Sequence, residues 1–188
     1  MLRFLFFCFK ILNIFFMATV IQTLYNANIY INGGSYAGRA EEVTLPDLKP
    51  KMVDHKPLSG IGSFELPTGL DKMTMKIKWN SADDQIMGNS ADFYNSKDIM
   101  IRANADVWVN GTRSGSYPVT AFVRGLSKNL PPIGLKHQDN PDVESEYSVT
   151  AYKLEYDGNV VFDVDFFAQV YIVEGVDMLA QYRANLGL

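Results

Sequence analysis

The fold class is decided by one stretch of sequence, Glu146-Tyr-Ser-Val-Thr-Ala-Tyr-Lys-Leu-Glu-Tyr-Asp-Gly-Asn-Val-Val-Phe-Asp-Val-Asp-Phe166. Its first half is rich in Tyr, Val and Thr, which favour strands. Asp157-Gly158 then provides a strong signal for a tight hairpin turn. Apolar and acidic residues alternate in the second half, at Val160, Phe162, Asp163, Val164, Asp165 and Phe166. The stretch therefore predicts an antiparallel β-hairpin with an apolar face and a face that carries Asp163 and Asp165.

The same period of two extends toward the N-terminus. Apolar and polar residues alternate over Met73–Trp79, which predicts a half-buried strand, and again over Ile99–Val109, which predicts a long one. Asn110-Gly111 predicts a tight hairpin turn, with a longer loop up to Ser116 as the alternative, followed by a return strand over Tyr117–Leu126. Short strands are expected over Asn28–Asn32 and Glu41–Leu45. We therefore expect a mainly β protein, an antiparallel sandwich or barrel-like fold.

Two helices are expected beside these strands. The first runs from Ser81, its expected N-cap, to about Tyr94, with Asp83 and Asp84 in the first turn. The second lies within the last sixteen residues, with Asp177 in the first turn and Gly187 just past its end. Its apolar stripe is expected to pack on the sandwich and comprises Val176, Leu179, Ala180, Tyr182 and Leu186.

Two segments show no sustained periodicity. Pro46–Asp71 contains Pro46, Pro50, Pro57, Pro67, Gly60, Gly62 and Gly69, and Ser127–Ser145 contains Pro131, Pro132 and Pro141. Loops of this length are uncommon in compact domains unless they are functional or ordered by a partner. We therefore expect contacts with other molecules in these segments.

Composition bounds the class of protein. The chain has 188 residues, 47% of them hydrophobic and 13% aromatic, which is sufficient for one globular domain. Its 17 basic and 21 acidic residues give a net charge of −4. A surface that grips nucleic acid needs clustered Lys and Arg, so tight phosphate binding is not expected.

The first sixteen residues, MLRFLFFCFKILNIFF, differ in kind from the rest. We favour the interpretation that they lie upstream of the true start at Met17, because Phe, Leu, Ile, Asn and Lys are what AT-rich DNA encodes when it is read through. A signal peptide or membrane anchor is the alternative, although Lys10 and Asn13 interrupt the apolar run. Residues 17–188 are then expected to form a single domain. N-terminal mass spectrometry of the native protein distinguishes the two, since a mature chain that retains Met1 contradicts our preference.

The sequence holds little that points to catalysis. His55 and His137 are its only histidines, and neither lies in a metal-ligand spacing. Cys8 lies in the leader, and Ser59-Gly-Ile-Gly-Ser63 lacks the ending of a phosphate loop. Asp163 and Asp165 could hold a cation or act as acid and base, but a solvated strand face explains them as well. We expect no enzyme activity, no metal and no cofactor.

Several blocks of the chain resemble the major tail tube proteins of contractile-tail phages and R-type pyocins, in the family's order. These blocks are Asn26–Gly38, Val43–Pro50, Val123–Leu126, Tyr152–Gly158, Gly175–Leu179 and Arg183–Leu188. The family is similar to the inner tube of type VI secretion systems, and the resemblance runs from about Gln22 to Leu188. The leader, Met1–Phe16, is the part of the chain that the family lacks.

The resemblance implies a structural protein of a virion tail, assembled in the bacterial cytoplasm. Hexameric rings would stack into a hollow tube inside a contractile sheath, and DNA would pass through without specific binding. The implied partners are further copies of the chain together with sheath, tape-measure and baseplate proteins, and no membrane.

Physical arguments from the residues fit this picture. Long strands with open edges are an aggregation hazard that ring closure removes. Carboxylates that face a lumen would repel phosphates, so we expect some of Asp98, Asp106, Asp163 and Asp165 to face it. The segment with Pro46, Pro50, Gly60, Gly62 and Pro67 is expected to reach a neighbouring subunit or ring.

Two rival interpretations remain open at this point. One is a secreted or signal-anchored β-sandwich binding module that uses the leader. The other is a hydrolase built around Asp163 and Asp165.

Overall fold

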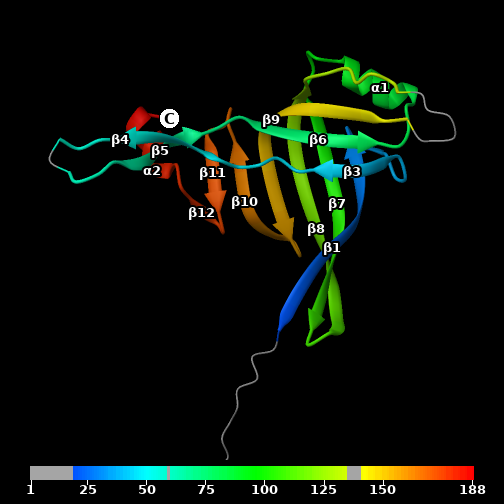
Figure 1. The fold of residues 1–188 in the computed structure, drawn as a ribbon, viewed down its shortest axis with the longest axis horizontal. Helices are drawn as coiled ribbons and strands as arrows, with labels where there is room; N and C mark the ends of the chain where they lie inside the picture. The colour runs from blue at the N-terminus through cyan, green and yellow to red at the C-terminus, as the bar shows by residue number, and fades with distance from the viewer. Residues whose placement is uncertain (1–18, 59, 135–140) are drawn as a thin grey trace, which may run out of the picture.

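A long antiparallel sheet forms the larger layer of the protein (Figure 1). The computed structural model describes residues 19–58, 60–134 and 141–188; the leader with Cys8, Ser59 and His137 lie outside these ranges. The strands of this sheet lie in the order β12–β11–β10–β9–β8–β7–β1–β2. Their bounds are β1 Val20–Ile31, β2 Gly34–Ser35, β7 Lys97–Val109, β8 Thr112–Ser127, β9 Val143–Tyr156, β10 Asn159–Asp165, β11 Val170–Val173 and β12 Val176–Asp177.

A second layer crosses over this sheet (Figure 1). It consists of β3, Ala40–Thr44, and β6, Met73–Trp79, which pairs on its other side with the first half of β9. Because β9 pairs with β6 through Val149 and with β10 from Ala151, it passes from one layer to the other. The predicted antiparallel sandwich or barrel-like fold is confirmed.

The core lies between the two layers. In β6 the four apolar residues that alternate with polar ones are all buried, as the period of two predicted. The buried cluster includes Ile29, Met73, Met75, Ile77, Trp79, Ile99, Val123, Val143, Tyr147 and Val164. The Trp79 indole donates to Ser145 Oγ at 3.0 Å, so the largest buried side chain also has its polar atom satisfied.

Two predicted hairpin turns are present. Asp157 and Gly158 have φ of 50° and 76°, and Asn110 and Gly111 have φ of 50° and 82°. These are the positive angles that the Asn-Gly and Asp-Gly pairs tolerate. The tight turn at Asn110-Gly111, rather than the longer loop up to Ser116, is the one observed, and the return strand starts at Thr112 instead of Tyr117.

Helix α1, Asp84–Ala91, is shorter than predicted. Asp83 rather than Ser81 is its N-cap, and the Asp83 carboxylate accepts from the Ile86 amide at 2.9 Å. Asp caps a helix as well as Ser does, so the sequence held two equivalent start signals. The helix ends where the Asp92 carboxylate accepts the amides of the following turn.

The segment Pro46–Asp71, expected to be irregular, contains a second, separate sheet. Strands β4, Pro50–His55, and β5, Phe64–Leu70, pair as an antiparallel hairpin that projects from the sandwich (Figure 1). Nearly all of its residues are exposed, so neither face produces the apolar alternation by which a strand is recognised in sequence. We call it the β4–β5 hairpin.

The chain ends in helix α2, Ala180–Leu186, with Gly187 at its end in the left-handed region, as predicted. Asp177 lies in β12 rather than in the first helical turn, where it accepts the Leu179 amide at 2.9 Å. Most residues of the predicted apolar stripe do not pack on the sandwich of the same chain, contrary to the prediction. Val176, Tyr182 and Leu186 are all more than half exposed, and only Leu179 is half-buried.

Candidate assembly surfaces

The first candidate surface is the polar face of the large sheet, opposite the core. Strand register places Asp98 beside Arg124, Arg124 beside Ala151, and Ala151 beside Asp165. The next row places Phe122 beside Lys153 and Lys153 beside Asp163. Three of the four carboxylates singled out in the sequence, those of Asp98, Asp163 and Asp165, therefore line one open hollow with Arg124 and Lys153.

Both cations that line this hollow, Arg124 and Lys153, are paired. Arg124 Nε lies 2.7 Å from the Asp98 carboxylate, which raises the pKa of the guanidinium further. Lys153 Nζ lies 2.7 Å from Glu155 and over the Phe122 ring. Asp165 also accepts the amides of Phe167 and Ala168, so its carboxylate holds the turn after β10. The face is a mixed, mildly acidic surface rather than a purely acidic one.

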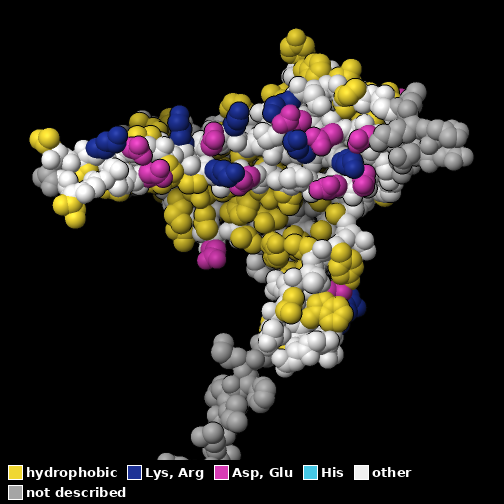
Figure 2. Space-filling model, in the orientation of Figure 1, with side chains coloured by type: hydrophobic (Ala, Val, Ile, Leu, Met, Phe, Trp, Pro, Cys, Tyr) yellow, Lys and Arg dark blue, Asp and Glu magenta, His cyan; other side chains and the backbone are white. Residues whose placement is uncertain are grey.

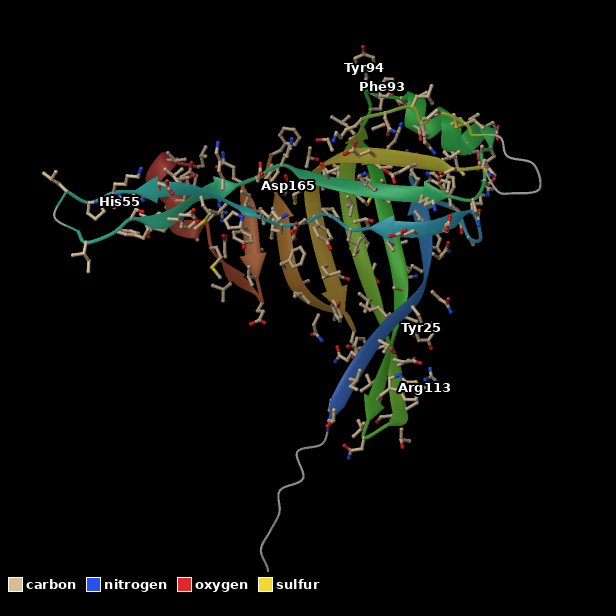
Figure 3. The ribbon with its side chains drawn as sticks, viewed as in Figure 1. Tyr25, His55, Phe93, Tyr94, Arg113 and Asp165 are labelled. Carbon is tan, nitrogen blue, oxygen red and sulfur yellow. The ribbon has the colours of Figure 1, made fainter. Side chains whose placement is uncertain are left out.

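Asp106, the fourth carboxylate singled out in the sequence, does not line this hollow. It is only 2% exposed, and Arg113 covers it with two bonds of 2.8 Å, assisted by the hydroxyl of Tyr25 and the amide of Asn104 at 3.0 Å. Asp106 therefore presents no free carboxylate in one chain, which strand alternation could not reveal, because the covering side chains come from neighbouring strands. Tyr25 and Arg113 approach it from β1 and β8 (Figure 3).

The Asp106 cluster predicts an acid-sensitive local structure. The hydrogen bonds from Arg113 and then Tyr25 lower the pKa of Asp106 from 3.8 to about 2. A depressed carboxylate pKa stabilises the fold above the unfolded pKa, and this contribution is lost as pH falls through the folded value. In a Trp79→Phe background, we expect the fluorescence of Trp108, which donates to Thr23 nearby, to change between about pH 4 and pH 2.

The matched control separates Asp106 from general acid effects. Asp106→Asn should give the altered Trp108 emission already at neutral pH, with no further transition in that window. Asp98→Asn removes an exposed pair far along β7 and should leave the emission as in the parent. A Trp108 transition that survives in Asp106→Asn would contradict the assignment.

The second candidate surface is an extension of the sheet that we call the arm. It consists of Val20–Tyr25 of β1, Ala105–Val109 of β7 and Thr112–Tyr117 of β8, and it projects beyond the second layer (Figure 1). Val20 pairs with Val109 and Leu24 with Ala105, so these residues share one face, and Val20 and Leu24 are more than half exposed. This apolar face continues the core face of the sheet past the layer that covers it.

The third candidate surface is the outer end of the β4–β5 hairpin. Leu58 and Ile61 are fully exposed there, and Met52, Val53, Phe64 and Leu66 are exposed along its strands. Figure 2 shows hydrophobic side chains at the free end of this hairpin, whereas a band of charged side chains crosses β3 and β6. That band is built of pairs such as Lys78–Glu41 at 3.1 Å and Lys76–Glu144 at 2.8 Å. The His55 ring packs against the Phe64 ring in a tilted arrangement, with ring centroids 5.1 Å apart.

An apolar groove lies between the base of this hairpin, strands β10 and β11, and α2. Leu48, Leu70, Met178, Leu179 and Tyr182 line it, together with Pro50 and Pro67, in a volume of about 820 Å³. Leu179 and Tyr182 of the predicted C-terminal stripe thus border an open groove rather than a filled core. Of the predicted hairpin residues, Pro50 and Pro67 lie at this base, whereas Gly60 and Gly62 lie at the outer end and Pro46 precedes β4.

The β7 part of the arm was predicted, as the end of the long strand expected over Ile99–Val109, but its β1 and β8 parts were not. The signal for the β1 part was present, since the apolar residues of Val20–Tyr25 continue N-terminal to the strand expected at Asn28. Within residues 19–58, 60–134 and 141–188, no group of three or more His, Cys, Asp or Glu is placed to hold a metal ion. No helix in the same described part of the chain is long and apolar enough to cross a membrane.

Comparison with known proteins identifies the class. A family model described as phage tail tube protein FII matches residues 21–187. The tail tube protein of Escherichia phage P2 is 29% identical over 165 residues, covering 86% of this chain and 94% of that protein.

Solved structures show the same fold. A chain from the sheath/tube terminator of an extracellular contractile injection system, PVC, matches with a TM-score of 0.50 at 13% identity, over 70% of this chain and 94% of that one. A chain from the PVC sheath-tube complex in the extended state matches equally well, over 70% and 89%.

The chain is therefore a structural subunit of a phage tail tube, with a β-sandwich fold. It belongs to the phage tail tube protein FII family. The resemblance stated from the sequence blocks is confirmed, and the interpretation as a secreted binding module is not favoured.

Proposed function

We propose that copies of this chain assemble into hexameric rings that stack into a hollow tube through which DNA is delivered. The observation that carries the proposal is the apolar surface that one chain leaves uncovered on the arm, the β4–β5 hairpin and the groove beside α2. Monomeric proteins rarely expose such patches unless another molecule covers them. Membership of the tail tube family supports other copies of the chain as that molecule.

Ring closure would pair the edges of the large sheet. The sheet ends in β12 on one side and β2 on the other, and each of these strands has only two residues. Most of the outer edge of β1 lies beyond β2 and is open to a neighbouring chain, and pairing across copies would remove this exposed edge. A head-to-tail contact of this kind closes into a ring when the rotation allows it.

The polar face is proposed to line the lumen, with Asp98, Asp163 and Asp165 on it. Its carboxylates repel phosphates, and Arg124 and Lys153, the two cations that line the hollow, are already paired with Asp98 and Glu155. DNA would therefore pass without specific binding. The role is structural, without catalysis.

Further partners follow from the same role. The β4–β5 hairpin, from Pro46 to Pro67, is proposed to contact a neighbouring subunit or ring through its outer end. A contractile sheath around the tube is supported by the likeness to a chain of the PVC sheath-tube complex. Tape-measure and baseplate proteins are proposed as further partners. Assembly is proposed to take place in the bacterial cytoplasm, before the tail is part of a particle.

Negative-stain electron microscopy of the purified full chain tests the proposal. We expect hollow tubes of uniform diameter, with six-fold symmetry in end views. Monodisperse monomers at every protein concentration, or solid fibres without a lumen, would contradict it.

A further inference from the structure

An aromatic pair projects from the turn between α1 and β7. Phe93 is 43% exposed and Tyr94 is 94% exposed, although aromatic side chains of this size usually lie in cores or interfaces. Figure 3 shows both side chains at the far end of the molecule from the arm. Neither side chain belongs to the buried cluster between the layers. We call residues 92–96 the aromatic turn.

Hydrogen bonds and an ion pair of the Asp92 carboxylate hold the aromatic turn in place. The Asp92 carboxylate accepts from the amides of Tyr94 at 3.3 Å and Asn95 at 3.2 Å, and from the Asn95 side chain at 3.0 Å. It is also paired with Lys97, which is itself only 5% exposed. These bonds lower the pKa of Asp92 to about 2. Such fixing lowers the ordering cost when an exposed aromatic side chain docks on a partner.

Strand β7 joins the aromatic turn to the arm. It begins at Lys97, directly after the turn, and ends at Val109, at the end of the arm. Thirteen residues at about 3.3 Å each separate the two by roughly 40 Å. The aromatic turn and the apolar face of the arm therefore lie at opposite ends of one rigid element.

We propose that Phe93 and Tyr94 of one subunit dock on the apolar face of the arm, at Val20 and Leu24, of a second copy in the next ring. This rests on the proposed stacked tube. A contact between two different surfaces at opposite ends of a subunit repeats without closing, which is what an open-ended stack of rings requires. Docking would cover both apolar surfaces at once.

The ion pairs nearest the two surfaces are already satisfied within one chain. On the arm, Arg113 is paired with Asp106 on the face opposite Val20 and Leu24. In the aromatic turn, Asp92 is paired with Lys97. Docking of the two apolar surfaces therefore leaves both ion pairs intact, and burying an unpaired charge is the costly alternative.

Crosslinking between copies tests the proposal. In a Cys8→Ser background, Tyr94→Cys combined with Leu24→Cys should form intermolecular disulfides in assembled tubes, giving a ladder of covalent oligomers on non-reducing gels. Each single variant should give at most dimers. Tyr94→Cys combined with Asn159→Cys, at an exposed turn outside the proposed contact, is the matched control and should give no ladder.

The critical concentration for tube formation provides the second readout. Tyr94→Ser alters a side chain that is almost entirely exposed, so folding should be unaffected, while the critical concentration for tubes should rise about thirtyfold, as for a hot-spot residue. Intact tubes without a ladder, or Tyr94→Ser tubes of normal length that fail only to co-assemble with sheath, would overturn the proposal. If the parent chain forms no tubes at all, it is the proposed function that fails.

Discussion

Shortening the β4–β5 hairpin is expected to abolish tube formation while leaving the sandwich folded. The change replaces residues 52–68 with Asn-Gly, so that the paired residues Lys51 and Gly69 flank a two-residue turn. The strands removed are almost wholly exposed and contribute nothing to the buried cluster, so little burial is lost within one chain. Negative-stain microscopy and sedimentation should show soluble subunits in place of tubes, with a thermal unfolding midpoint close to that of the parent.

A milder variant separates the apolar outer end from the length of the hairpin. Leu58→Ser with Ile61→Ser keeps both strands and changes only two fully exposed side chains. If these side chains make the contact, this variant should assemble as poorly as the truncation. Lys51→Ser, at the exposed base, should assemble normally. Tubes of normal length from the truncated chain would show that the hairpin makes no required contact.

Strands with one buried face, and the tight turns between them, were predictable from the sequence. The alternation in Met73–Trp79 and the pair Asp157-Gly158 specify strand and turn locally, because burial and positive φ each demand particular residue types. The same logic misses the β4–β5 hairpin. Its strands have no buried face within one chain. We therefore expect their apolar residues to be buried only by contacts with other molecules.

The candidate surfaces were only partly predictable, for a related reason. Alternation correctly groups Asp163 with Asp165, since both lie on one strand and side chains two apart share a face. It cannot show that Arg113 and Tyr25, from two other strands, cover Asp106. That fact depends on register between strands distant in sequence.

The C-terminal helix illustrates the limit of amphipathic patterns. Its stripe indicates that Val176, Tyr182 and Leu186 need an apolar partner, but the pattern does not say which molecule supplies it. In this chain they remain more than half exposed, and Tyr182 borders a groove rather than a core. An amphipathic stripe in a subunit of an assembly is thus equally a prediction of an interface.

Replacing Gly125 with Val is expected to destabilise the fold more than any other single change in β8 without a change of charge. Gly125 lies at the bulge where β8 and β9 turn from one layer to the other. A Cβ there would lie 2.8 Å from the Ser148 carbonyl oxygen and 3.3 Å from its carbon. Both are backbone atoms, which cannot move aside as a flexible side chain would.

The expected loss is about 3 kcal/mol, the upper part of the range for overpacking a well-packed site. Urea unfolding of monomers, followed by the fluorescence of the buried Trp79, measures it. Gly115→Val is the matched control, because nothing lies within 4 Å of a Cβ at Gly115 in the same strand. That variant should stay within about 0.5 kcal/mol of the parent, as surface substitutions usually do. Equal stability of the two variants would mean that the strands at the corner can separate freely, and that the close approach of β8 and β9 does not hold the two layers together.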